Sequence, residues 1–312
     1  MKVKIALVQP ESARGADEYQ NAESAVSYLE ESARTGAQLV CFPEGYPGPA
    51  HGPLDSGGHL ATSPVEMLAR RAKELGIYTT ASNVEENPQL PGTFYLSSKL
   101  ISPEGKIIAD HKRVQPDEPD LNEYLFGGRR DFAPGEQLTV VDTPLGKIGL
   151  LICSEIFVPE LARIEMLMGA EIIIAPVNGI CRESACVNPS DPPLWDTWRC
   201  ISRARAAENM TYVIVTTNIF LKGSKGVAHV SSPEKILAMS TDPGILTTEL
   251  DMDRLRWLRT HTLDWDFLNG AYAKEMGTIG TRLGQHRLRR PEVYQKLLEP
   301  LPSDWNYWYF TK

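Results

Sequence analysis

The stretch from Lys147 to Pro159 reads KIGLLICSEIFVP. Its apolar run, Ile148 to Ile152, ends in Cys153 and then turns polar, which is the pattern of a buried strand that delivers one reactive side chain at its end. A thiol becomes an effective nucleophile only when a neighbouring group takes its proton or lowers its pKa. The stretch therefore predicts a sheet-based fold with Cys153 as a candidate nucleophile, and a base and a cation must come from elsewhere in the chain.

Strand-like and helix-like segments alternate along most of the chain. Strands are expected at 3–9, 38–42, 77–83, 93–101, 106–113, 137–141, 147–152, 171–176, 211–217, 227–230, 235–239 and 245–250. Helices are expected at about 17–34, 64–75, 158–168, 195–209 and 251–259. This alternation is typical of helices that flank sheets. Because the composition does not change before about residue 262, we expect one catalytic domain, 1–261, followed by a tail, 262–312.

Composition and charge exclude several classes of protein. The chain has 42% hydrophobic and 23% charged residues, as a globular protein with a sizeable core does. A formal net charge of −8 opposes general binding to nucleic acid or to an anionic membrane, because the long-range field repels phosphate. No apolar stretch is long enough to span a bilayer, and the N-terminus runs straight into a strand-like pattern rather than a cleavable signal. We therefore expect a cytoplasmic protein.

The cysteines and histidines give no metal or disulfide pattern. Five cysteines with irregular spacing do not suggest a disulfide framework. Cys181 and Cys186 lack a second Cys or His pair nearby, and His51 and His59 lie in a Gly-rich loop without carboxylate support. We expect no metal and no cofactor.

Three polar side chains directly follow buried strand-like runs. Glu44 follows LVCF, Lys112 follows IIADH, and Cys153 follows GLLI. Residues at strand ends are held by a rigid sheet and still reach a cleft. Their chemistry is coherent: a glutamate can take the thiol proton, the cysteine can attack a carbonyl or nitrile carbon, and the lysine can stabilise the anionic intermediate.

Each of these residues also has an ordinary structural interpretation. A lone Cys153 is better read as a buried structural thiol, since free cysteine is among the most buried residue types. Glu44 could simply begin a turn, and Lys112 could be a solvated strand end. It is the combination of the three that favours catalysis.

At these residues the sequence resembles the nitrilase, or carbon-nitrogen hydrolase, superfamily. The resemblance runs through KIALVQP, FPEGYPG, HKRVQP, LLICSEIFVPELAR, GAEIIIAPVNG and RARAAENMTYVIVTTN, and it weakens in the tail. It implies that Glu44 is the general base, Lys112 the cation beside the intermediate and Cys153 the nucleophile. A second family glutamate is best matched by Glu123 in NEYLFGG, with Glu118 as the rival.

The resemblance also implies the fold and the reaction. The fold is a four-layer α-β-β-α sandwich, and the reaction is hydrolysis of a small non-peptide amide through a cysteine acyl-enzyme, with release of ammonia or an amine. Members that act on nitriles usually have Trp and Glu after the cysteine, whereas Ser154 and Glu155 follow here, which favours an amide. The tail segment RRPEVY favours the alternative, a nitrilase. A catalytically silent scaffold or interaction protein is the alternative from another class.

Several residues near the motifs are candidates for contact with the substrate. They are Ser154, whose backbone N–H would assist the cation, together with Tyr46, Glu155, Phe157, Asn178 and Trp195. The aromatic members could equally be packing residues, and Glu155 could instead pair with an arginine.

The tail ends in the aromatic run NYWYF. An exposed patch of this kind usually marks an interface, and dimers are typical of the family that the sequence resembles. We therefore expect a homodimer or a larger homo-oligomer, with a small amide or nitrile as the only other partner.

Overall fold

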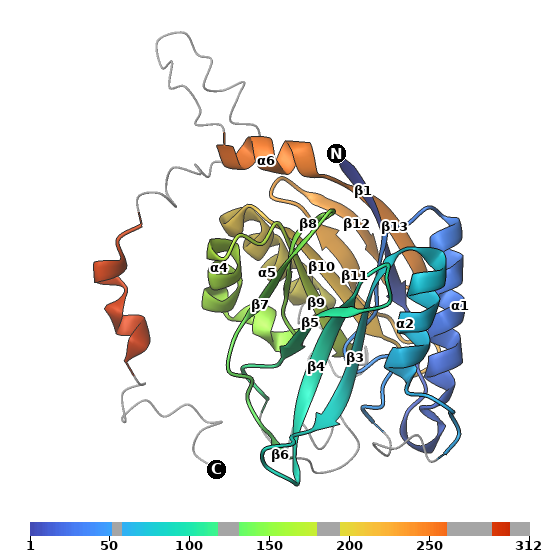
Figure 1. Ribbon diagram of the computed structural model, residues 1–312. Coiled ribbons are helices and arrows are strands. Elements are labelled where there is room, and N and C mark those ends of the chain that lie inside the picture. Colours follow the sequence, from blue (N-terminus) through green and yellow to red (C-terminus); the bar gives the residue numbers. More distant parts are fainter. Residues whose placement is uncertain (52–57, 118–130, 180–193, 261–288, 300–312) are drawn as a thin grey trace. The chain divides into compact units, whose positions relative to one another are not determined.

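The first of two sheets has the strand order β13-β1-β2-β3-β4-β5, and the short β6 pairs with β4. Its strands are β13 (Gly244–Asp251), β1 (Lys2–Gln9), β2 (Leu39–Cys41), β3 (Tyr78–Glu86), β4 (Thr93–Ile101), β5 (Ile107–Lys112) and β6 (Asp131–Phe132). β1, β2 and β3 run parallel, while β4 and β5 return in antiparallel register. In the computed structural model in Figure 1, the described residues are 1–51, 58–117, 131–179, 194–260 and 289–299.

The second sheet has the strand order β12-β11-β10-β9-β8-β7. Its strands are β12 (Ile236–Ser240), β11 (Ala228–Ser231), β10 (Tyr212–Asn218), β9 (Ile172–Gly179), β8 (Gly146–Leu150) and β7 (Thr139–Thr143). β8, β9 and β10 are parallel neighbours, β7 and β11 are antiparallel to them, and β12 is antiparallel to β11. The apolar run before Cys153 thus begins in β8, which lies between β9 and the edge strand β7.

The two sheets pack face to face because their central strands carry apolar side chains on both faces. One face contributes to a shared core that joins the sheets, with Ile5, Leu39, Ile148, Ile172 and Ile214 among its fully buried members. Strands covered on both sides are expected to read as continuous apolar runs rather than as strict alternation. This is why the central strands were recognisable as short hydrophobic segments.

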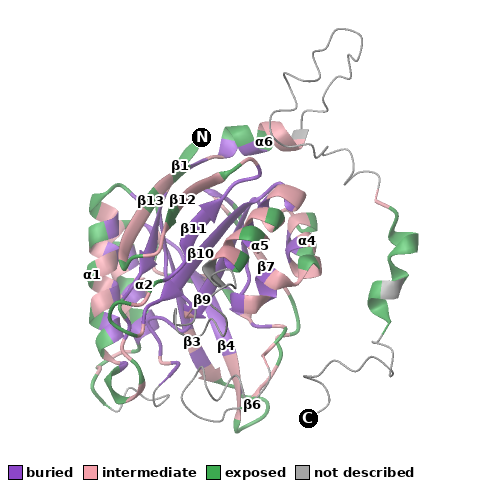
Figure 2. Ribbon diagram, turned by 180° about the vertical axis from the view of Figure 1, so that it is seen from behind, coloured by how far each residue is buried: buried purple, intermediate pink, exposed green. Residues whose placement is uncertain are grey.

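Helices cover the outer face of each sheet. α1 (Gln20–Arg34) and α2 (Pro64–Leu75) pack on the first sheet through residues such as Leu29 and Leu68, while α4 (Pro159–Leu167) and α5 (Leu194–Asn209) pack on the second. Figure 2 shows the central strands buried, the outer strands β12 and β13 partly exposed, and the helices exposed on their outer faces. The predicted α-β-β-α sandwich is confirmed.

The chain divides into two units, Met1–Arg259 and Thr260–Lys312. The first unit ends within α6 (Met252–Thr260), and the described part of the second holds two short 3-10 turns, η4 (Pro291–Val293) and η5 (Gln295–Leu298). The expected boundary at residue 262 and the packing of the tail remain predictions, and the NYWYF run lies outside the described residues. Among the described helices, none is both long and apolar enough to cross a membrane.

Candidate active site

Glu44 lies three residues after the end of β2, and its side chain is fully buried. The turn that holds it needs a glycine, because Gly45 has φ +67° and an added Cβ would lie 2.8 Å from the Cβ of Ala50. The Gly45 N–H donates to the Ser82 hydroxyl at 2.8 Å, and the Asn218 side-chain amide donates to the Glu44 carbonyl at 2.8 Å. Side chains of both sheets therefore fix the peptide group between Glu44 and Gly45.

Cys153 begins the 3-10 turn η2 (Cys153–Phe157), three residues after the end of β8. Its φ of +54° lies in the left-handed region, which a non-glycine residue rarely adopts. The side chain is buried, and its thiol and the Glu44 carboxyl group are close enough for each to change the pKa of the other. The segments that follow β2 and β8 thus bring the predicted base and the predicted nucleophile together.

The ionisation of this pair is set mainly by burial. Burial raises the pKa of Glu44 to about 7, although the positive charge of Arg113 and the neighbouring Cys153 lower it. Burial, followed by the negative charge of Glu44, raises the pKa of the Cys153 thiol well above its ordinary value. The resting pair is therefore a protonated thiol beside a carboxyl group that can accept a proton near neutral pH.

The structure does not bring Lys112 to this pair, which corrects the expectation from the sequence. The Lys112 ammonium is paired with Glu85 and lies 3.0 Å from Asp110. Side chains of a strand alternate between its faces, so Lys112 shares a face with Asp110. The cation on the other face is the next residue, Arg113, whose Nη1 lies 3.6 Å from Oε1 of Glu44.

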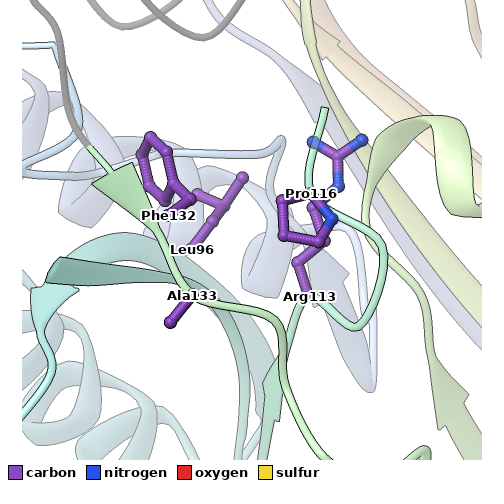
Figure 3. A pocket seen from close by; sticks show the side chains of 5 residues that line it. All are labelled: Leu96, Arg113, Pro116, Phe132 and Ala133. Atoms are coloured by element: carbon purple, nitrogen blue, oxygen red, sulfur yellow. The ribbon is translucent and has the colours of Figure 1, made fainter. Parts of the chain in front are cut away.

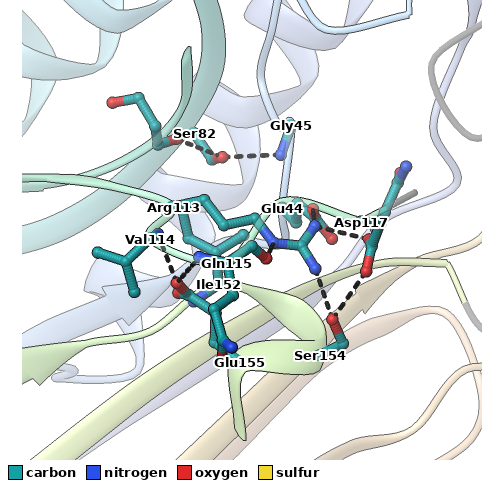
Figure 4. Close-up of polar contacts among 12 residues, drawn as sticks. Glu44, Gly45, Ser82, Arg113, Val114, Gln115, Asp117, Ile152, Ser154 and Glu155 are labelled. Carbon is teal, nitrogen blue, oxygen red and sulfur yellow. Dashed lines mark hydrogen bonds and ion pairs between the residues drawn. The ribbon is translucent and has the colours of Figure 1, made fainter. Parts of the chain in front are cut away.

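Arg113 is held by several partners and is 2% exposed. Nη1 lies 2.8 Å from a carboxylate oxygen of Asp117, Nη2 donates to the Ser154 hydroxyl at 2.5 Å, and Nε donates to the Gln115 carbonyl at 2.9 Å (Figure 4). The Ser154 hydroxyl in turn donates to Asp117 at 2.9 Å. Ser154 is therefore at the site as predicted, whereas Arg113 and Asp117 were missed.

Glu155 is a buried anchor rather than a substrate ligand. Its carboxylate accepts from His111 Nε2 at 2.9 Å, from Ile152 N–H at 2.7 Å, from Val114 N–H at 2.7 Å and from Gln115 N–H at 3.2 Å (Figure 4). Its side chain is buried, and both carboxylate oxygens are already bound by groups of the protein itself. These bonds join the turn that carries the nucleophile to the segment that carries the cation.

Two of the aromatic candidates pack against other aromatic rings, which is the packing alternative that the sequence had left open. Tyr46 is buried beneath α1 and α2 and stacks on Phe42 with ring centroids 5.5 Å apart. Phe157 packs against Trp198 of α5, with centroids 4.4 Å apart. An aromatic ring near a catalytic motif is as easily buried beneath a helix as exposed to a cleft, and sequence alone does not separate the two cases. The Trp195 side chain, Glu123 and Glu118 lie outside the described residues.

Asn178, at the end of β9, does reach the site. Its backbone lies near enough to the Glu44 carboxyl group to lower the pKa of Glu44, and its side-chain oxygen lies 2.9 Å from Nε2 of His51. The backbone N–H of His51 donates at 2.8 Å to Glu18, which also accepts from the Ala50 N–H at 2.6 Å. Buried polar groups therefore support the glutamate from the side of β9 as well.

A hollow of about 190 Å³ lies beside the Arg113 segment (Figure 3). It is lined by Leu96, Pro116, Phe132, Ala133 and Arg113. The hollow is partly open to solvent and encloses no space for a ligand, and Arg113 is the single charged residue in its lining. Among the described residues, no group of His, Cys, Asp or Glu side chains is arranged to hold a metal ion.

The family model of carbon-nitrogen hydrolases matches residues 4–262. The chain belongs to the carbon-nitrogen hydrolase family. As a member of this family it is an enzyme that cleaves carbon–nitrogen bonds other than peptide bonds, and the resemblance seen in its motifs is confirmed.

Curated relatives and solved structures agree with this assignment. The carbon-nitrogen hydrolase is 26% identical to an omega-amidase of Xenopus laevis, over 77% of this chain and 86% of the relative. It is 28% identical to an omega-amidase of Saccharomyces cerevisiae, over 69% of this chain and 73% of the relative. A carbon-nitrogen hydrolase of Helicobacter pylori superposes with a TM-score of 0.74 at 22% identity, over 96% of this chain and 99% of that one.

A nitrilase-superfamily amidase of Nesterenkonia shows the same fold. It superposes with a TM-score of 0.65 at 23% identity, over 81% of this chain and 92% of that chain. Its structure contains the acetamide moiety of fluoroacetamide added covalently to the active-site cysteine. At this level of identity, both structural matches establish the fold of the present hydrolase.

Proposed function

We propose that this enzyme hydrolyses a small non-peptide amide through an acyl-enzyme on Cys153, with Glu44 as the general base. The observation that carries the proposal is the contact between the Glu44 carboxylate and the Cys153 thiol in a buried site. A carboxyl group whose pKa is about 7 has the proton affinity that a base needs at neutral pH. The omega-amidase relatives support an amide as the substrate, and the cysteine adduct of the Nesterenkonia amidase supports a cysteine as the nucleophile.

In the first half of the reaction, Glu44 takes the proton of the Cys153 thiol, and the sulfur forms a bond to the amide carbon. The carbonyl π electrons move to oxygen, which becomes an oxyanion. When the oxyanion collapses, the carbon–nitrogen bond breaks, and Glu44 returns the proton to the leaving nitrogen. Ammonia or an amine departs and a thioester remains.

In the second half, Glu44 takes a proton from water, and the water oxygen attacks the thioester carbon. Collapse of this second oxyanion breaks the carbon–sulfur bond, the proton returns to sulfur, and a carboxylic acid leaves. The backbone N–H of Ser154, which follows the nucleophile, is a suitable donor to both oxyanions. No oxidant, reductant or cofactor is required by this sequence of steps.

The test combines substrate choice with a matched pair of cysteine variants. Ammonia release is measured for amides, nitriles and N-carbamoyl compounds with the same side chain. We expect amides to be preferred, Cys153→Ala to abolish turnover, and Cys200→Ala to leave it unchanged, because Cys200 is exposed on α5. Intact mass spectrometry should detect an acyl adduct in the wild type and the Cys200 variant alone.

Preference for the nitrile within a matched pair would make the enzyme a nitrilase and refute the amide assignment. Full activity of Cys153→Ala would refute the nucleophile. Assembly into a homo-oligomer and a cytoplasmic location remain predictions, which light scattering and fractionation can test separately.

A further inference from the structure

Two adjacent cations end the β5 segment, and they face opposite sides. Lys112 points to the face that carries Asp110, where Glu85 and Asp110 neutralise its charge, and its side chain is 25% exposed. Arg113 points to the face of His111, toward the second sheet. Because a strand reverses its side chains at each residue, one step along the chain decides which cation reaches the nucleophile.

Arg113 is fixed where charge would develop during the proposed reaction. Its guanidinium lies beside Glu44 and is bound by Asp117, Ser154 and the Gln115 carbonyl. Burial opposes its charge, but the neighbouring Cys153, Glu44 and Asp117 raise the pKa of Arg113 above its usual value. The cation is therefore both permanent and oriented before any substrate binds.

The charge count of the cluster also suits this role. Before reaction, the charge of Arg113 faces the carboxylates of Glu44 and Asp117. When Glu44 accepts the thiol proton, its negative charge disappears, and one negative charge develops on the substrate oxygen. The total is unchanged, so Arg113 exchanges one anionic neighbour for another without any change in the charge buried at the site.

We propose that Arg113, and not Lys112, is the catalytic cation that stabilises the oxyanion, with Asp117 and Ser154 as positioning residues. This inference rests on the proposed acyl-transfer reaction. It distinguishes the site from a Glu-Lys-Cys arrangement in two ways. A guanidinium offers a planar pair of donors in place of a single ammonium, and it does not give up a proton, so Glu44 must carry every proton that is transferred.

The experiment compares Arg113→Gln and Arg113→Lys with Lys112→Gln, the matched control one residue away. Loss of one donor to an oxyanion lowers kcat by about 100-fold to 1,000-fold, which is the effect expected for Arg113→Gln with little change in KM. Arg113→Lys should recover part of this loss and should lose activity at alkaline pH, as the introduced amine deprotonates. Lys112→Gln should retain kcat within about two-fold, because its partners lie on the other face.

Two further measurements separate catalysis from structure. Alkylation of Cys153 by iodoacetamide forms no oxyanion, so Arg113→Gln should slow it by less than about ten-fold. Circular dichroism and thermal melting identify a variant that fails to fold, and in that case Arg113→Lys supplies the comparison. If alkylation falls as much as turnover, Arg113 acts on the thiol and the oxyanion role is refuted.

A p-nitrophenyl ester makes the inference independent of the amide assignment. Acylation of Cys153 by the ester passes through the same oxyanion and releases nitrophenolate, whether or not the enzyme cleaves amides. Ester acylation that depends on Arg113, in an enzyme with no amide turnover, would refute the proposed function and support the inference. Equal losses in Lys112→Gln and Arg113→Gln, or normal turnover in Arg113→Gln, would refute the inference itself.

Discussion

Replacement of Glu155 by alanine is expected to destabilise the enzyme strongly, because its carboxylate has no exposed surface and accepts four hydrogen bonds. The donors are His111 Nε2 and the backbone N–H groups of Ile152, Val114 and Gln115. Removal of one partner from a buried charged pair costs about 3 to 5 kcal/mol. For a unit of this size, each kcal/mol lowers Tm by about 2 to 4 °C. We therefore expect Glu155→Ala to melt about 10 °C below the wild type.

Glu155→Gln sharpens the prediction, because glutamine keeps one oxygen of the same shape. That oxygen can still accept from Val114 and Gln115, but the amide nitrogen then faces the Ile152 N–H, and two donors meet. One unsatisfied buried donor costs about 1 to 3 kcal/mol, which corresponds to a loss of about 5 °C in Tm. A smaller loss of Tm in Glu155→Gln than in Glu155→Ala would show that the hydrogen bonds of Glu155 stabilise the fold as well as its charge.

The assay is thermal melting followed by circular dichroism, with Glu249→Ala as the matched control. Glu249 is exposed on β13, where a substitution changes stability by about 0.5 kcal/mol or less. The reasoning is refuted if Glu155→Ala melts no lower than the control. A rise in KM for Glu155→Gln with an unchanged Tm would return Glu155 to the substrate-binding role that the sequence suggested.

The same pair predicts how stability depends on pH. Burial raises the pKa of Glu155, but the hydrogen bond and charge of His111, with the Ile152 N–H and Arg113, outweigh it, so the folded-state pKa is lowered. A lowered pKa means that the carboxylate stabilises the fold above the unfolded value of about 4.3, and that this contribution is lost as the pH falls through the folded value. The Tm difference between wild type and Glu155→Gln should therefore shrink in acid.

Two more predictions concern the loop that carries the base. Because Glu44 must be ionised to accept the thiol proton, kcat/KM should rise with pH through about 7. Glu44→Gln should remove the activity and, with it, this rise in the pH profile. A rise that persists in that variant would contradict the assignment. Gly45→Ala should lower Tm more than Gly36→Ala. Both glycines have a positive φ, but an added Cβ at Gly45 would lie 2.8 Å from the Cβ of Ala50, whereas one at Gly36 would meet no atom within 4 Å. Equal losses of Tm in thermal melting would count against a steric conflict at Gly45.

Much of the fold was predictable because strands buried on both faces have continuous runs of hydrophobic residues in the sequence. Central strands such as β8 and β9, covered by a sheet on one side and by helices on the other, read as unbroken apolar runs, and the ordered motifs identified the family. Glu44 and Cys153 were predictable for the same reason, since each lies just beyond such a run. Candidates chosen for nearness in sequence were less reliable, and Tyr46, Phe157 and Glu155 are packing or anchoring residues.

By itself, the sequence determined the sandwich and the family and proposed Glu44 and Cys153 as base and nucleophile, since these inferences depend on local hydrophobic runs and on motifs. Only the tertiary structure decided which cation faces Cys153. Lys112 and Arg113 are neighbours of like charge, and the face that each presents depends on the register of β5 within the first sheet and on the second sheet packed against it. The sequence shows that Ala109, His111 and Arg113 share one face of the β5 segment, but which face of that segment is buried depends on the partner sheet.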